Sequence, residues 1–78
     1  MRVRKQFFGY VEVDEQRVRI RGLVGDKTIL LERITSVSAN RLTGQLLIET
    51  GAQIHRIGFW RAAHAVAVKL ALDTVAAH

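Results

Sequence analysis

The clearest pattern in the chain is an alternation of apolar and charged residues on either side of a short acidic segment. Positions 10–13 and 17–21 alternate in this way, as strands with one buried face do, and residues 14–16 separate them. With residues 15 and 16 at the tip, the facing pairs are Tyr10–Arg21, Val11–Ile20, Glu12–Arg19, Val13–Val18 and Asp14–Arg17. This register puts the β-branched residues on one face and both acids opposite arginines, so it predicts a well-specified hairpin.

Four further short runs have the composition of strands. They cover residues 27–31, 34–40, 45–50 and 53–57, with a break near residues 32–33 and glycine-containing turns at 43–44 and 51–52. Six short strands at intervals of about eight to ten residues are typical of a meandering antiparallel sheet that curls into a barrel or a two-layer sandwich.

The last twenty residues differ in character. Residues 59–78 contain seven alanines and no glycine, which favours a helix. The strict alternation of Val66, Val68, Leu70 and Leu72 would suit a strand, but a strand of this length is rare. We therefore expect one domain over residues 1–78, mainly β, with strands over about 7–58 and one C-terminal helix over about 59–77.

The expected helix has apolar residues on two opposite sides. One stripe contains Phe59, Ala63, Val66 and Leu70, and a second contains Val68, Leu72 and Val75, flanked by Arg61 and His64. A helix that is apolar on both sides is normally covered on both sides. We expect the first stripe to pack on the sheet and the second, with Arg61 and His64 as its rim, to form an interface with another copy or a protein partner. The competing possibility is that the sheet receives the second stripe.

Phe59 and Trp60 open the expected helix. Large aromatic side chains at this point can cover the open end of a small barrel that lacks apolar volume. We expect both rings to belong to the core.

The order of these elements resembles a short bacterial pleckstrin-homology-like domain. The hairpin between Gly9 and Gly22 carries this resemblance, together with three patterns: Ile29-x-Leu31-x-x-Ile34-x-x-Val37, Leu46-x-Ile48-x-x-Gly51 and the segment 58–63. The resemblance implies a strongly curved, partly open antiparallel barrel of six or seven strands with a helix over one open end. The full fold has seven strands, and this chain reaches that number only if residues 2–8 form one. The resemblance also implies a non-catalytic module that binds proteins or, less often, anionic lipid headgroups. The loop corresponding to the phosphoinositide-binding loop of such domains, residues 22–26, has no cluster of Lys and Arg.

Composition narrows the functional classes. The 78 residues carry a formal charge of +5 and contain no cysteine, which excludes disulfides and thiolate–zinc sites. The basic N-terminus is followed by no apolar segment of a signal peptide, and no stretch approaches the length of a membrane span. We expect a cytoplasmic protein, with peripheral membrane attachment as a further option.

Residues suited to catalysis form no recognisable constellation. His55, His64 and His78 lack metal-site spacing, and Ser36 and Ser38 lack a nucleophile-elbow motif. Glu12 and Asp14 are accounted for by the arginines that face them. The sequence therefore predicts no enzyme, no cofactor, no metal and no small-molecule substrate.

The basic residues allow two interpretations. Arg17, Arg19 and Arg21 share one strand face, and Arg2, Arg4 and Lys5 would join them if the N-terminal segment docks there. They form either a phosphate-binding stripe or a solvated face whose charges are balanced across the strands, with Tyr10 the only aromatic among them. The primary hypothesis is a non-catalytic protein-binding or assembly module that self-associates through its helix. The alternative is an electrostatic binder of nucleic acid or an anionic membrane surface.

Overall fold

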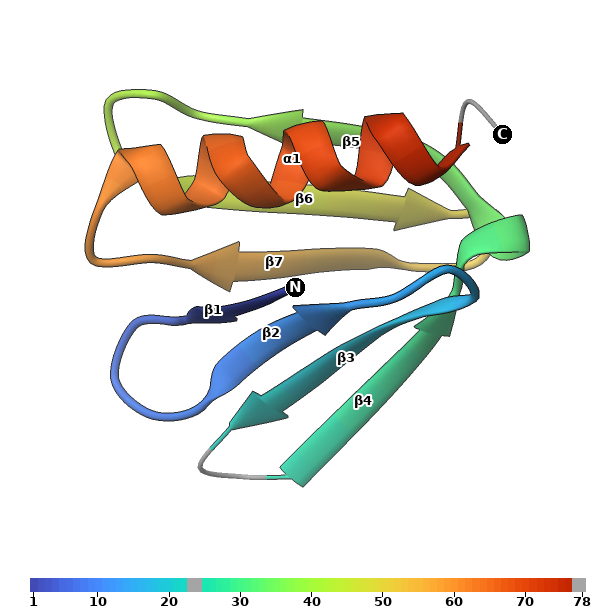
Figure 1. The fold of residues 1–78 in the computed structure, drawn as a ribbon, viewed down its shortest axis with the longest axis horizontal. Helices are drawn as coiled ribbons and strands as arrows, with labels where there is room; N and C mark the ends of the chain where they lie inside the picture. The colour runs from blue at the N-terminus through green and yellow to red at the C-terminus, as the bar shows by residue number, and fades with distance from the viewer. Residues whose placement is uncertain (23–24, 77–78) are drawn as a thin grey trace.

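Over residues 1–22 and 25–76, which the computed structural model describes, seven strands form two antiparallel sheets and one helix lies at the C-terminal end (Figure 1). The first sheet is β1 (Arg2–Arg4), β2 (Tyr10–Val13), β3 (Arg17–Gly22) and β4 (Gly25–Leu30). A 3-10 turn, η1 (Leu31–Arg33), leads to the second sheet, which is β5 (Ile34–Ala39), β6 (Gln45–Thr50) and β7 (Ile54–Gly58). The helix α1 spans Ala62–Ala76. The mainly β architecture with a C-terminal helix is confirmed, but the strands of the described residues form two separate sheets that do not close into a barrel.

The predicted hairpin is confirmed in its register. β2 and β3 pair through Tyr10–Arg21, Val11–Ile20, Glu12–Arg19 and Val13–Val18. The turn closes as expected, because the Asp14 backbone N–H donates to the Arg17 carbonyl at 3.1 Å. The side chains of Val11 and Val18 are fully buried, so the inward face is the predicted one.

The other strands lie close to their predicted positions. β6 matches its prediction, β5 ends one residue early, and the predicted break near residues 32–33 is the 3-10 turn. β4 begins at Gly25 rather than residue 27, and Leu23 and Val24 of the predicted connection lie outside the described residues. The N-terminal segment supplies a seventh strand, β1, which pairs Val3 with Val11.

The core lies between the two sheets and the inner face of α1, which contacts β1, β2, β5 and β6. Its buried residues come from both sheets, the helix and the segment between β7 and α1: Val11, Val13, Val18, Ile20, Ile29, Leu46, Ile48, Ile57, Phe59, Ala65, Val68 and Leu72. Alternate positions of β2, β3 and β6 supply six of them, as expected for strands with one buried face.

The face of α1 that packs on the sheets is the opposite of the predicted one. Val68 is 0% exposed and Leu72 is 2% exposed, whereas Leu70 of the predicted core stripe is 59% exposed. The prediction that Val68, Leu72 and Val75 form an intermolecular interface is therefore wrong for Val68 and Leu72, which belong to the core of their own chain. The spacing of Ala65, Val68 and Leu72, three and four residues apart, produces one continuous buried stripe.

Phe59 and Trp60 have separate environments. Phe59 is 2% exposed and belongs to the core, as predicted, and its backbone N–H donates to the Gly44 carbonyl at 2.9 Å. Trp60 is 63% exposed, so its predicted core role is wrong. Because α1 begins at Ala62, both aromatics precede the helix, and the helical repeat does not determine where their rings point.

Candidate functional site

Five of the predicted anion-binding residues lie on the outer face of the first sheet. Val11 and Ile20 point into the core, so their neighbours along the strands point outward. The register sets Arg2 beside Glu12 and Glu12 beside Arg19, and it sets Arg4 beside Tyr10 and Tyr10 beside Arg21. Arg17 lies on the same face, and Lys5 follows β1 at the sheet's end. Four of the six predicted residues, Arg2, Arg4, Lys5 and Arg21, therefore border one hollow, whereas Arg19 and Arg17 lie farther along the same face.

Acidic side chains on this face neutralise part of its positive charge. Glu12 pairs with Arg2 at 2.9 Å rather than with the predicted Arg19, and Asp14 lies 3.9 Å from Arg17. Asp26 pairs with Arg21 at 3.2 Å. Among the described residues, no ion pair engages Arg4, Lys5 or Arg19. These cations remain available to an anionic partner.

Aromatic side chains gather where this face reaches the loop between β1 and β2. Phe7 and Trp60 meet edge to face with ring centroids 5.4 Å apart, and the Arg2 guanidinium lies 4.3 Å from the centre of the Tyr10 ring. Together they border a hollow of about 900 Å³, lined by Arg2, Arg4, Lys5, Phe7, Phe8, Gly9, Tyr10, Arg21, Gly22 and Trp60. We call this the basic–aromatic hollow. The sequence prediction placed only Tyr10 among the basic residues and missed the other three aromatics.

The loop that supplies Phe7 has a strained backbone. The Phe8 N–H donates to the Gln6 carbonyl at 3.0 Å, and Phe7 between them has a φ of 70°. This three-residue turn corresponds to the strained form of the γ-turn, and a bulky side chain seldom adopts a positive φ. The Phe7 side chain is nevertheless 80% exposed, so no burial in the core offsets this strain. An exposed, strained aromatic residue indicates a function outside the fold itself.

Two backbone contacts hold the loop in this position. The Gln6 N–H donates to the Gly58 carbonyl at 2.8 Å, which ties the loop to the end of β7. Gly9 has a φ of 99° and lies so close to β3 that a Cβ there would be 1.9 Å from the Arg21 carbonyl oxygen. Only glycine fits this position, which keeps the loop against the sheet.

The turn between β5 and β6 lies at the same end of the molecule as the β1–β2 loop (Figure 1). Leu42, in the turn between β5 and β6, is 94% exposed, and its neighbour Arg41 is also exposed. Gly44 of this turn accepts the hydrogen bond from Phe59, so the turn adjoins the segment that carries Trp60. We call the whole surface the basic–aromatic end and define it by its exposed or half-buried side chains: Arg4, Lys5, Phe7, Phe8, Arg41, Leu42, Trp60 and Arg61.

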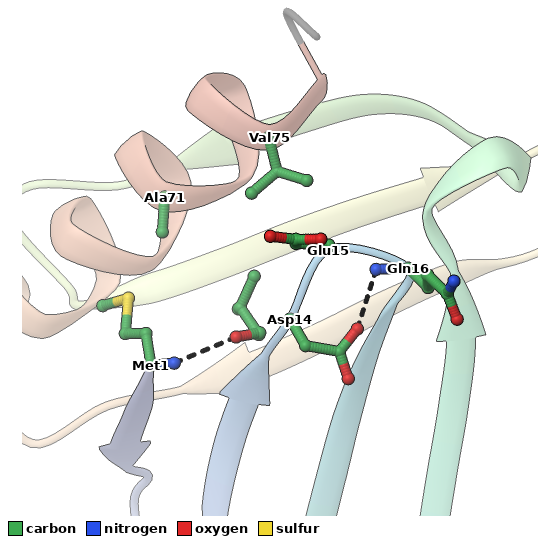
Figure 2. A pocket seen from close by; sticks show the side chains of 7 residues that line it. Met1, Asp14, Glu15, Gln16, Ala71 and Val75 are labelled. Atoms are coloured by element: carbon green, nitrogen blue, oxygen red, sulfur yellow. Dashed lines mark hydrogen bonds between the residues drawn. The ribbon is translucent and has the colours of Figure 1, made fainter.

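The opposite end of the molecule carries a second, differently built hollow. It has a volume of about 640 Å³ and lies between Met1, the β2–β3 turn and α1, lined by Met1, Val13, Asp14, Glu15, Gln16, Ala71 and Val75 (Figure 2). Val75 of the predicted interface stripe is half-buried here. The other two predicted interface residues, Arg61 and His64, lie near the far end of the helix, Arg61 exposed and His64 half-buried.

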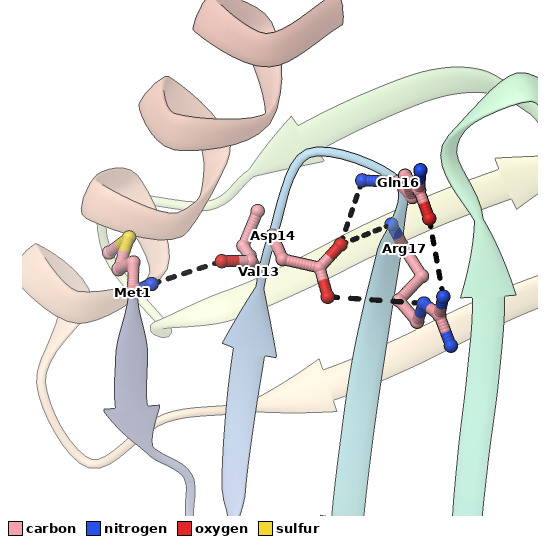
Figure 3. A network of polar contacts seen from close by, with 5 residues as sticks. All are labelled: Met1, Val13, Asp14, Gln16 and Arg17. Atoms are coloured by element: carbon pink, nitrogen blue, oxygen red, sulfur yellow. Dashed lines mark hydrogen bonds and ion pairs between the residues drawn. The ribbon is translucent and has the colours of Figure 1, made fainter.

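The Asp14 carboxylate is occupied by its own turn (Figure 3). It accepts the backbone N–H groups of Gln16 at 2.7 Å and Arg17 at 2.9 Å. These two donors lower the pKa of Asp14 below its usual value of 3.8, because they stabilise the ionised form. The arrangement is that of a side chain that stabilises a turn.

Candidate metal ligands do not gather in the part of the chain that the structure describes. His55 lies on β7 and His64 on α1, and His78 is outside the described residues. No group of three His, Cys, Asp or Glu side chains suited to a metal ion occurs within residues 1–22 and 25–76.

No protein-family model matches this sequence, and no curated protein or solved structure is significantly similar to it. Within the described residues, no helix has the length and apolar character needed to cross a bilayer.

Proposed function

We propose that this protein is a non-catalytic binding module that docks its basic–aromatic end on an anionic membrane surface. One observation carries the proposal: three separate loops expose large apolar side chains at the same end, and each is flanked by basic residues. Phe7 and Phe8 lie in the β1–β2 loop, Leu42 in the β5–β6 turn and Trp60 between β7 and α1. Their exposures lie between 63% and 94%. A cluster of exposed apolar side chains of this kind marks an interaction surface.

The chemistry of this end suits the boundary between headgroups and acyl chains. Aromatic rings favour this boundary, where one end is apolar and the other hydrated. Basic side chains near an anionic bilayer contribute about 1 kcal/mol each. Lys5, Arg41 and Arg61 are engaged by no ion pair of the described residues, so their charges are not neutralised within the chain. The expected attachment is peripheral, reversible and sensitive to salt.

The element order is consistent with this assignment. Antiparallel strands followed by one C-terminal helix is the element order that the resemblance to pleckstrin-homology-like domains implies. In this chain the cations come from residues 4–5, 41 and 61 rather than from the connection 22–26. Self-association through Val68 and Leu72 loses its support, because both side chains pack inside their own chain.

Nucleic acid is the competing partner for the same surface. The basic–aromatic hollow offers rings for stacking and cations for phosphates, which is the chemistry of single-strand binding. Leu42 favours the membrane, since this 94% exposed aliphatic side chain lies outside the hollow and offers nothing to a nucleotide.

Vesicle binding tests the proposal directly. Trp60 is the only tryptophan, so its emission reports on this end of the molecule. We expect a blue shift with vesicles that contain phosphatidylserine and a weaker or absent shift with pure phosphatidylcholine. Phe8→Ser with Leu42→Ser should weaken binding at least about tenfold. Leu70→Ser, on the exposed face of the helix, is the matched control and should bind like the wild type.

A charge series completes the experiment. Arg41→Gln with Arg61→Gln should reduce both the affinity and its dependence on salt, whereas Arg33→Gln at the opposite end should change neither. Absence of vesicle binding in low salt would refute the proposal. Salt-dependent binding of single-stranded RNA without vesicle binding would instead identify nucleic acid as the partner.

A further inference from the structure

A further hollow opens between the two sheets, on the side of the core away from the helix. It has a volume of about 400 Å³ and is bordered by β3 and β4 of the first sheet, by β7 of the second and by the loop that follows β1. The contacts of α1 fall mainly on β5 and β6, and Figure 1 shows α1 and β4 at opposite edges of the view. We call this space the inter-sheet hollow.

The floor of the inter-sheet hollow is part of the apolar core. Ile20 of β3 and Ile57 of β7 line it and are only 8% and 4% exposed, so the hollow reaches down to core residues of both sheets. The Phe7 ring adds an aromatic wall, and Gly22 and Gly58 leave room because they carry no side chain. An apolar group that enters the hollow would contact the core directly.

Two polar side chains point into this space from opposite sheets. Lys27 pairs with Ile20 across β3 and β4, and His55 pairs with the fully buried Ile48 across β6 and β7. Residues that face each other in a ladder share one side of the sheet, so Lys27 and His55 lie on the side of the core. Within residues 1–22 and 25–76, no ion pair engages either side chain.

The charge around the inter-sheet hollow is positive and unbalanced. Lys5 and Arg56 add two cations to Lys27, and no acidic side chain of the described residues lines the hollow. Asp26, next to Lys27 on β4, pairs with Arg21 on the outer face of the sheet. An inward lysine on an edge strand also hinders pairing between sheet edges, but that role requires no cation or imidazole on β7. The hollow is therefore complementary to an anion.

We propose that the inter-sheet hollow binds a small anionic amphiphile, a carboxylate attached to a short hydrocarbon chain. The carboxylate lies between Lys27 and His55, which donate hydrogen bonds to it, and the chain packs on Ile20 and Ile57. A hollow of this volume, with an apolar floor and a few converging polar groups, is typical of small-molecule sites. This inference goes beyond membrane docking, although Phe7 borders both surfaces.

Decanoate is the probe that tests the proposal, in calorimetric titration and in methyl NMR. We expect saturable binding of one molecule per chain with a Kd of about 1 mM or lower. Decanol has the same hydrocarbon chain without the charge and should bind at least about fivefold more weakly. The methyl resonances of Ile20 and Ile57 should shift on binding, whereas those of Ile34 on β5, outside the hollow, should not.

Two variants address the charge and the space separately. Lys27→Gln should weaken decanoate binding about fivefold or more. Arg19→Gln removes the same charge from the outer face of β3 and should leave the affinity within about twofold of the wild type. Gly22→Val should block binding, because Gly22 shares the inward side of β3 with Ile20. A Cβ there would meet only the flexible end of Lys5, at 3.2 Å, so the variant should fold.

The outcomes separate this inference from the proposed function. Lack of saturable decanoate binding, equal binding of decanol, or shifts at Ile34 instead of Ile20 and Ile57 would overturn the inference. An equal loss in Arg19→Gln would also overturn it, since it would show a general attraction to a basic protein. Lys27→Gln should bind anionic vesicles like the wild type.

The converse variant completes the separation. Arg41→Gln with Arg61→Gln, which weakens vesicle binding, should bind decanoate like the wild type, because neither residue lines the inter-sheet hollow. Failure of vesicle binding therefore bears on the proposed function alone, and failure of decanoate binding bears on this inference alone.

Discussion

Strand β2 begins and ends in two connections of opposite character. The β2–β3 turn is stabilised by its own residues, because the Asp14 carboxylate accepts two backbone N–H groups. The β1–β2 loop holds Phe7 at a φ of 70° and leaves both phenylalanines exposed to solvent. Its backbone is tied to β7 by the hydrogen bond from Gln6 to Gly58, and Gly9 lies in close contact with β3.

This difference separates a connection that stabilises itself from the one that we propose contacts a partner. In the β2–β3 turn, the Asp14 side chain satisfies two backbone N–H groups of the turn itself. In the β1–β2 loop, Phe7 keeps a φ of 70° and meets Trp60 edge to face, yet both phenylalanine side chains stay largely exposed. The second connection is therefore the one to examine for a binding role.

The exposed phenylalanines of the β1–β2 loop are informative only if the rest of the chain buries its apolar side chains. Leu72→Glu tests this burial and has the largest expected effect. Leu72 is 2% exposed, so the substitution buries a charge and should cost about 4 kcal/mol or more, enough to unfold a small domain. Leu70→Glu, at a 59% exposed position, should change the free energy of unfolding by less than about 0.5 kcal/mol. Circular dichroism and urea titration measure both. Unfolding by Leu70→Glu alone would reverse the assignment of the helix faces.

Gly9→Ala tests what holds the strained loop. The new Cβ would collide with the Arg21 carbonyl oxygen at a position with a φ of 99°, so we expect a loss of at least about 2 kcal/mol in urea denaturation. Gly51→Ala is the control, because no atom lies within 4 Å of the place its new methyl group would occupy, and it should stay within about 0.5 kcal/mol of the wild type. Equal effects of the two would mean that the loop does not depend on its contact with β3.

Phe7→Gly distinguishes strain from packing. Glycine adopts a φ of 70° without steric cost, so the free energy of unfolding should stay the same or rise by up to about 1 kcal/mol, while vesicle binding falls. Phe8→Gly relieves no positive φ and should lower stability by about 0.5–1 kcal/mol through the entropy of the unfolded chain. A clear loss of stability in Phe7→Gly would show that the Phe7 ring contributes to the fold through Trp60.

The smallest effect is expected at the β2–β3 turn, through the titration of Asp14. The Gln16 and Arg17 amides lower the pKa of Asp14 in the folded state. The ionised carboxylate therefore contributes its full stabilisation above about pH 3.8, the unfolded pKa, and this contribution is lost as the pH falls through the lower pKa of the folded state. Thermal unfolding of wild type and Asp14→Asn across this range measures the difference. A difference that grows toward acid pH would contradict the assignment.

The sequence predicted the elements that are set by local patterns. Two matched alternations and the position of the acids determine the β2–β3 register, because a shift by one residue would expose Val11 and Val18. The sequence left β1 open, as the strand that residues 2–8 had to form if the sheet was to have seven, because three residues carry too short a pattern. The pairing of β1 with β2 joins residues that are farther apart along the chain than the residues paired across the β2–β3 turn.

The helix face and the binding end could not be predicted in the same way. Apolar residues occur on opposite sides of α1, so the sequence pattern does not determine which side packs on the sheets. The prediction also counted Phe59 as a helical residue, which added a large aromatic side chain to the wrong stripe. Phe7 and Trp60 are more than fifty residues apart, and only the tertiary fold brings their rings together. A basic residue beside a large apolar one, as in Lys5 near Phe7, Arg41–Leu42 and Trp60–Arg61, is the local signal that could have indicated this end.

Each strand of the two sheets pairs only with its neighbours along the chain, so both sheets are simple meanders within the described residues. Every ladder can then form by closing a short loop, which costs little chain entropy. Packing of α1 against β1 and β2 is the contact that joins the most distant parts of the sequence. Folding should therefore be fast for a mainly β chain, on the order of milliseconds, with the docking of the helix among the last events.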